Sequence, residues 1–164
     1  MTELTLEEFF DEYIIKASHN LSLSYPFHTF FILCVAIEIL GKQLDGKKTS
    51  RASFMNALYS FESLNKYVNL NYWSKEDGEI RNSLYDLRCG FAHMFKPGGI
   101  NCVNISQDDN DLNNNIIGCK SLLSDIEIAW NVVKSKYSKQ IKHLAIKCEG
   151  SITGSTQTNI SKQV

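Results

Sequence analysis

The segment from Phe27 to Leu44 is apolar nearly all round, and this pattern restricts the folds open to the chain. Pro26 suits the first turn of a helix, because proline lacks the N–H that would be left unpaired there anyway. A helix with no polar face has to be buried, so we expect this one at the centre of an all-α fold. Its most apolar run, Phe30 to Leu40, contains Glu38 and falls short of the about 20 residues that span a membrane.

Capping signals mark two further helices. Thr5 and Glu8 form a capping box, which predicts a first helix over roughly residues 6–19. Thr49 or Ser50 can cap a third helix in the same way. The apolar positions of these two helices recur at helical spacing. They are Leu6, Phe10, Tyr13, Ile14, Ala17 and Leu21 in the first helix, and Phe54, Leu58, Phe61, Leu64 and Val68 in the third.

A fourth helix is predicted to open at Ser74, with Asp77 three residues later and a hydrophobic staple from Tyr72 and Trp73 before it. It ends near the sequence Lys96-Pro97-Gly98-Gly99, a strong stop signal. Its core-facing side chains should be Ile80, Leu84, Leu87 and Phe91.

The remaining sequence predicts one more helix and two irregular regions. Apolar residues repeat along one stripe over about 121–147, which indicates a fifth helix. Residues 100–119 place two short β-prone runs around an Asp/Asn-rich turn, so a small hairpin or an extended excursion is expected. Residues 149–164 have the composition of a polar tail. We therefore expect an antiparallel helical bundle of about five helices over residues 1–148.

Composition excludes several classes of protein. A formal net charge of −1 argues against non-specific coating of nucleic acid, which depends on neutralising phosphates. The five cysteines include no C-x-x-C pair and have no histidines at zinc-ligand spacing, so we expect no metal or other cofactor. The acidic, amphipathic N-terminus is not a signal peptide, and free thiols suit a reducing compartment. A cytoplasmic protein is expected.

Arg88 and His93 are the candidate catalytic residues, close to the end of the fourth helix. They pair a permanent cation with the side chain that titrates near neutrality, so together they could bind a phosphate and move a proton. On one ideal helix they diverge by about 140° and about 7.5 Å. The flank between them carries Tyr85, Cys89 and Ala92, and two small residues there would let a second copy of the helix approach. An isologous homodimer through this flank would bring Arg88 toward the partner's His93.

The segment Leu87-Arg88-Cys89-Gly90-Phe91-Ala92-His93 resembles the HEPN superfamily (higher eukaryotes and prokaryotes nucleotide-binding domains), in a variant seen in uncharacterised bacterial members. The run from Val35 to Lys42 is similar to the central helix of that family. The likeness spans roughly residues 5–147, although these two segments alone are specific.

This resemblance implies a homodimeric, metal-independent endoribonuclease that serves as a toxin with an antitoxin partner or as a phage-defence effector. Arg88 would hold the scissile phosphate, and His93 would shuttle a proton as the RNA 2′-OH attacks. The product would carry a 2′,3′-cyclic phosphate. Catalytic members often place Asn, Asp or His directly after the arginine, whereas this chain has Cys89, so a second polar contact is not supplied.

Other interpretations of the same residues stay open. The chain could be a non-catalytic module of this type that binds a nucleotide or a protein partner, or a structural helical adaptor. His93 could merely interact with the C-terminal dipole of its helix. Glu38, the one acid in the apolar helix, is expected to be buried and partnered; it either orients Arg88 or His93, or makes a structural salt bridge or a hydrogen bond to a tyrosine.

Overall fold

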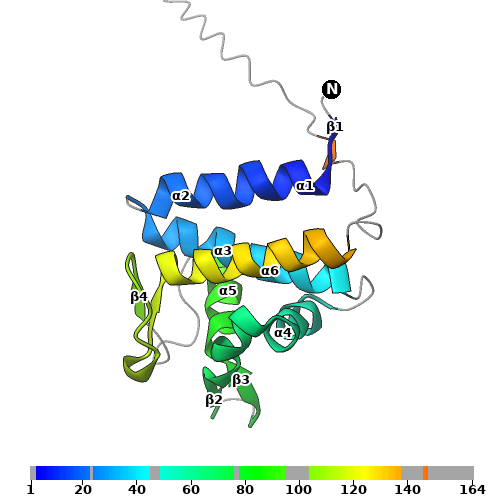
Figure 1. Ribbon diagram of the computed structural model, residues 1–164. Helices are drawn as coiled ribbons and strands as arrows, with labels where there is room; N and C mark the ends of the chain where they lie inside the picture. The colour runs from blue at the N-terminus through cyan, green and yellow to red at the C-terminus, as the bar shows by residue number, and fades with distance from the viewer. Residues whose placement is uncertain are drawn as a thin grey trace, which may run out of the picture.

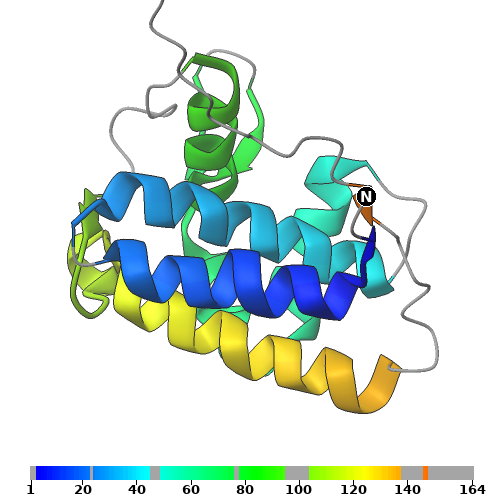
Figure 2. The ribbon, with the colours of Figure 1, turned by 90° about the horizontal axis from the view of Figure 1, so that it is seen from above.

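The computed structural model describes residues 3–22, 24–44, 49–75, 78–94, 104–137 and 146–147. This part of the chain is mostly helical, which confirms the all-α class. Three long helical segments lie side by side, and a shorter helix with a β-hairpin stands crosswise to them (Figures 1 and 2). The α-helices are α1 (Leu6–Phe9), α2 (Ala17–Ser22), α3 (Pro26–Leu44), α4 (Ser50–Ser60), α5 (Ser83–Met94) and α6 (Cys119–Tyr137).

The first helical segment runs without a break from α1 through the π-helical η1 (Phe10–Lys16) into α2. The Thr5–Glu8 capping box is confirmed: the Glu8 N–H donates to Thr5 Oγ1 at 3.1 Å, and the Thr5 N–H donates to the Glu8 carboxylate at 2.8 Å. Tyr13, one of the apolar positions at helical spacing, lies outside the core, because its side chain is 55% exposed. A π segment has more residues per turn than an α-helix, so the α-helical spacing of the core stripe is not kept through it.

Helix α3 lies at the centre of the fold, as predicted, and packs against α2, α4, α5 and α6. Its contact with α4 is close at Gly41, where a Cβ atom would lie 1.7 Å from the carbonyl oxygen of Ser53. A residue without a side chain is therefore required for these two backbones to meet.

By length and composition, α3 as a whole could cross a membrane, although its most apolar run, Phe30 to Leu40, is shorter than a membrane span. About half of its most apolar window is nevertheless buried against the rest of the protein. The core helix of a soluble protein meets the same criteria, so length and composition do not distinguish a membrane-spanning helix from a buried one.

Helix α4 begins as predicted, with Thr49 Oγ1 accepting from the N–H of Ala52 at 3.3 Å. It does not continue to Val68. The backbone of Phe61 is extended (φ −102°, ψ 119°), and the chain resumes as the 3₁₀ helix η2 (Glu62–Asn69). Phe61, Leu64 and Tyr67 are still buried, because a 3₁₀ helix places residues three apart on one face.

A β-hairpin replaces the predicted start of the fourth helix. Strands β2 (Asn71–Trp73) and β3 (Ile80–Asn82) pair antiparallel, and Gly78 adopts φ +67° in the turn between them. Ser74, the expected cap, instead closes the hairpin: its N–H donates to Glu79 O at 2.9 Å and its carbonyl accepts from Gly78 N at 3.0 Å. The staple from Tyr72 and Trp73 and the core position of Ile80 were accordingly wrong, since these residues lie in strands and Ile80 is 63% exposed.

Residues 104–118 form an extended excursion rather than a hairpin. Strand β4 (Asn104–Ser106) pairs parallel with β5 (Ile116–Gly118), and the 3₁₀ turn η3 (Leu112–Asn114) lies between them. A parallel pair needs a connection longer than a hairpin turn, which these intervening residues supply.

Helix α6 packs on the first helical segment. The Trp130 ring stacks on Phe10 at 4.2 Å between centroids, and its Nε1–H donates to Asp11 at 2.6 Å. The predicted extension of this helix to residue 147 was wrong at its end, because β6 (Ile146–Lys147) pairs antiparallel with β1 (Glu3–Leu4). Pairing with β1 satisfies backbone groups that a helix would have bonded within itself. The polar tail, 149–164, lies outside the described residues.

Candidate functional site around Arg88 and Glu38

Helix α5 carries Arg88 and His93, and its true N-terminal cap is Asn82. The Oδ1 of Asn82 accepts from the N–H of Tyr85 at 3.2 Å, which satisfies a backbone donor of the first turn. Leu84 and Leu87 are buried and fix the rotation of the helix, as the sequence predicted. The backbone of His93 lies in the last turn of α5, whereas the side chains of residues 91–94 lie outside the described part, as does the stop at 96–99.

Glu38 is buried, with 6% of its surface exposed, and its carboxylate accepts from three side chains. Arg88 Nη2 donates to Oε2, while Lys42 Nζ and Ser50 Oγ lie 2.7 and 2.8 Å from Oε1. This contact joins α3, α4 and α5 through one carboxylate. The prediction that Glu38 is buried within reach of a cation or a hydroxyl is confirmed. The ion pair with Arg88 fits both roles left open for Glu38, because a carboxylate that orients Arg88 and one that makes a structural salt bridge to it have the same geometry.

The charges in this cluster favour the ionised forms. Burial by itself would raise the pKa of Glu38, but hydrogen bonds from Lys42 and Ser50 and the charge of Arg88 lower it below its ordinary value. Burial would likewise lower the pKa of Arg88, but Glu38 raises it overall. Two cations face one carboxylate, so the cluster keeps a net positive charge.

Arg88 is not fully satisfied by Glu38. Its side chain is 17% exposed, and its Nε is a buried donor that has no hydrogen-bond partner among the residues that the structure describes. Arg88 was not among the core-facing positions expected on its helix, yet its side chain is largely buried because its guanidinium contacts Glu38 on α3.

The flank of α5 beside Arg88 is half-buried. The Tyr85 ring packs edge-on against Phe54, with centroids 5.3 Å apart. Burial, followed by a hydrogen bond with Cys89, raises the pKa of Tyr85 to about 12, so its hydroxyl is protonated at neutral pH. Cys89 is a half-buried free thiol. Ala92, the third residue of the predicted dimer flank, has its side chain outside the described part.

Sequence reasoning missed Lys42 and Ser50 as partners of Glu38. A signal for Lys42 existed, since an acid followed by a lysine four residues later on a helix forms an ion pair. For Ser50 there was none, because its position depends on how α4 crosses α3.

A second buried polar cluster links η2, the 104–118 segment and α6. Tyr67 donates to the Asp125 carboxylate and accepts from Asn110 Nδ2, both at 2.7 Å, and Lys66 reaches Asp125 at 2.8 Å. Burial raises the pKa of Tyr67 well above its ordinary value. The Tyr67 hydroxyl is thus already used as donor and acceptor, which fits a structural role better than a reactive one.

Stability below neutral pH gives a test of the Glu38 cluster. A carboxyl with a lowered folded-state pKa stabilises the protein above its unfolded pKa, and this stability is lost as the pH falls through the folded value. Between about pH 5 and pH 3 we expect the wild type to lose more free energy of unfolding than Glu38→Gln, which cannot titrate. Urea unfolding of both proteins across this range measures the difference. Parallel pH profiles of the two proteins would contradict a lowered pKa at Glu38.

No family model, curated protein or solved structure matches this chain. Within the described ranges, no group of three or more His, Cys, Asp or Glu side chains is placed to hold a metal ion.

Proposed function

We propose that this protein is a HEPN-type, metal-independent endoribonuclease that acts as a homodimer. The observation that carries the proposal is the state of Arg88, whose guanidinium a buried carboxylate holds in place while 17% of the side chain stays exposed. A phosphate oxygen is the kind of acceptor that an arginine donor binds with charge assistance. The net positive charge of the cluster favours such an anion.

The chemistry requires a phosphate contact and a proton acceptor. Arg88 holds the scissile phosphate, and His93 takes the proton from the 2′-OH as its oxygen bonds to phosphorus. The bond from phosphorus to the 5′-oxygen breaks, the leaving oxygen receives the proton from His93, and a 2′,3′-cyclic phosphate remains. Glu38 acts through Arg88 as a positioning residue. Incubating the purified protein with labelled RNA in EDTA tests this chemistry directly.

Dimerisation follows from the positions of Arg88 and His93 on one helix. Both lie on α5, five residues apart, so an α-helix separates them by about 7.5 Å along its axis and turns them to different sides. Two copies of α5 related by a two-fold axis would place Arg88 of each subunit near the partner's His93. The flank with Tyr85, Cys89 and Ala92 would form the contact.

The dimer is testable without any assay of activity. Sedimentation velocity at micromolar concentration should give a dimer for the wild type. Ala92→Glu should give monomers, because a charged side chain would be buried at the contact without a partner. Tyr13→Glu, a substitution at an exposed position on the first helical segment, is the matched control and should stay dimeric. A wild type that sediments as a monomer at this concentration would rule out the proposed interface.

The proposal also covers the arrangement of the helices, the location of the protein and its biological role. The fold would be an antiparallel bundle with α3 as its core helix, without membrane association, in the cytoplasm. The biological role would be that of a toxin paired with an antitoxin protein, or of a phage-defence effector. Neither role requires a cofactor.

A second candidate function is a non-catalytic module that binds a nucleotide or a protein partner. Two observations favour it: Glu38 already binds Arg88, and Cys89 follows the arginine where a polar residue would assist catalysis. In that case Arg88 would tie α3 to α5, and RNA would remain intact in the cleavage assay.

A further inference from the structure

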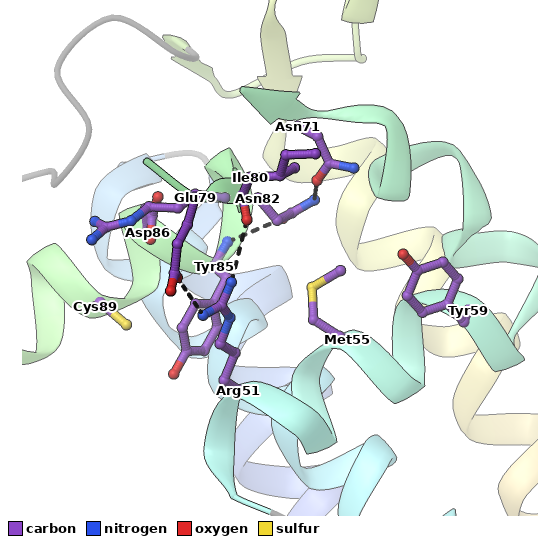
Figure 3. Close-up of a pocket in the computed structure, with 11 residues that line it drawn as sticks. Arg51, Met55, Tyr59, Asn71, Glu79, Ile80, Asn82, Tyr85, Asp86 and Cys89 are labelled. Carbon is purple, nitrogen blue, oxygen red and sulfur yellow. Dashed lines mark hydrogen bonds and ion pairs between the residues drawn. The ribbon is translucent and has the colours of Figure 1, made fainter. Parts of the chain in front are cut away.

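A cleft of about 480 Å³ opens beside the Arg88 cluster, between α4, the β2–β3 hairpin and the first half of α5 (Figure 3). Its volume lies within the range of about 300–1,000 Å³ that is common for small-molecule sites. The proposed ribonuclease chemistry at Arg88 and His93 does not use this cleft, although Tyr85 and Cys89 at its α5 edge also belong to the proposed dimer contact.

One wall of the cleft is a face of α4 that carries Arg51, Met55 and Tyr59. These residues are four apart, so they line up along the helix at intervals of about 6 Å. Tyr59 is 62% exposed although its ring is large and flat. The wall therefore offers a cation at one end, an apolar middle and an aromatic platform at the other end.

Arg51 is held loosely across the cleft. Its guanidinium lies 3.3 Å from the carbonyl oxygen of Ile80 and 3.5 Å from the Glu79 carboxylate, and its side chain is 52% exposed. Exposed ion pairs of this kind contribute little to stability, so an anionic ligand can compete for the guanidinium.

The hairpin adds an amide to the opposite wall. The Oδ1 of Asn71 accepts from Asn82 Nδ2 at 3.2 Å, and its amide nitrogen is turned away from Asn82 (Figure 3). An amide nitrogen is a donor suited to the ring nitrogens and carbonyls at the edge of a nucleobase.

The cleft and the Arg88 cluster are formed by neighbouring residues of α4 and α5. Tyr85 and Cys89 line the cleft from α5, and Cys89 is the neighbour of Arg88 in sequence. On α4, Ser50 binds Glu38 whereas the next residue, Arg51, reaches into the cleft. An RNA strand with a phosphate at Arg88 would thus have an adjoining unit within reach of this cleft.

We propose that the cleft binds one nucleotide unit, with its base stacked on Tyr59 and a phosphate on Arg51. Bases of every type stack on aromatic side chains, and an arginine fork binds phosphate with charge assistance. The unit is either a free nucleotide or one residue of a single RNA strand. The link to the cleavage site rests on the proposed function, whereas the binding itself does not.

Binding is measured with the full-length His93→Ala protein, so that RNA stays intact. Calorimetry with AMP, GMP, CMP and UMP tests free nucleotides, and fluorescence anisotropy of a short labelled RNA strand tests the polymer. Tyr59→Ala and Arg51→Ala should each weaken binding by about tenfold, and Tyr59→Phe should retain it because the ring remains. Tyr13→Ala and Lys16→Ala remove an exposed tyrosine and an ion-paired lysine from the first helical segment and should leave affinity unchanged.

The outcomes separate this inference from the proposed function. Binding that depends on Tyr59 and Arg51 supports the cleft, and the probe that binds identifies the source of the nucleotide. Absence of saturable binding by both kinds of probe overturns it, as does binding that neither substitution weakens. If the wild type cleaves RNA while these substitutions leave binding unchanged, the cleft fails and the ribonuclease stands. If nucleotide binding depends on Tyr59 but the wild type does not cleave RNA, the cleft is supported and the proposed ribonuclease activity is ruled out.

Discussion

Replacing His93 with alanine is expected to lower RNA cleavage by about 10²–10⁴-fold, the usual loss when a general acid–base group is removed. Cleavage by the wild type should persist in EDTA, because the proposed reaction uses an arginine and a histidine rather than a metal ion. His19→Ala is the matched control, since His19 is an exposed histidine that pairs with Glu127 at 2.7 Å, on α2 and α6. Its cleavage rate should equal that of the wild type.

Arg88 variants extend the same assay. Arg88→Ala should be as damaging as His93→Ala, because the phosphate loses its charge-assisted contact. Arg88→Lys should restore a part of the rate, since an ammonium group supplies the charge without the planar fork. Equal cleavage by wild type and His93→Ala would indicate a contaminant or another site. Absence of cleavage by both would favour the binding module.

Replacing Glu38 with alanine is expected to lower the free energy of unfolding by about 3 kcal/mol, because it leaves the largely buried Arg88 guanidinium without its anion. Arg88→Ala should also destabilise the fold, because it leaves the buried Glu38 carboxylate with one cation fewer. Its activity must therefore be compared at a temperature where it remains folded.

Urea unfolding of the two single variants and the double variant measures this coupling. The double variant should lose less than the sum of the single losses, because each single change breaks the same contact. Glu12→Ala is the matched control: Glu12 pairs with Lys16 at the surface, and its loss should cost no more than about 1 kcal/mol. Strictly additive losses at positions 38 and 88 would show that the two side chains are not energetically coupled.

Local signals in the sequence were sufficient to predict where several helices begin. The cap at Thr5, the cap at Thr49 and the proline at the start of α3 were all predicted, because each involves groups within three residues of one another. The central position of α3 followed from its apolar circumference. The burial of Glu38 followed from the same pattern, since an acid on such a helix has no exposed face to occupy.

The segment before α5 shows where local signals were ambiguous. Ser74 followed by Asp77 satisfies the pattern of a helix start, yet Ser74 closes a turn and the helix begins nine residues later. Gly78 accepts a positive φ at low cost, which makes the hairpin possible, and pairing between β2 and β3 stabilises it. With the two strands paired, Asn82 rather than Ser74 is the residue that caps α5.

The sequence by itself determined the helical class, the central helix α3, and the presence of Arg88 and His93 on one helix. The tertiary structure alone decided that Arg88 turns inward to Glu38, that Ser50 joins them, and that Arg51 and Tyr59 face a cleft. The physical reason is the range of the interactions. Caps and helical faces depend on residues a few positions apart, whereas the contact from 38 to 50 and 88 depends on how three helices cross.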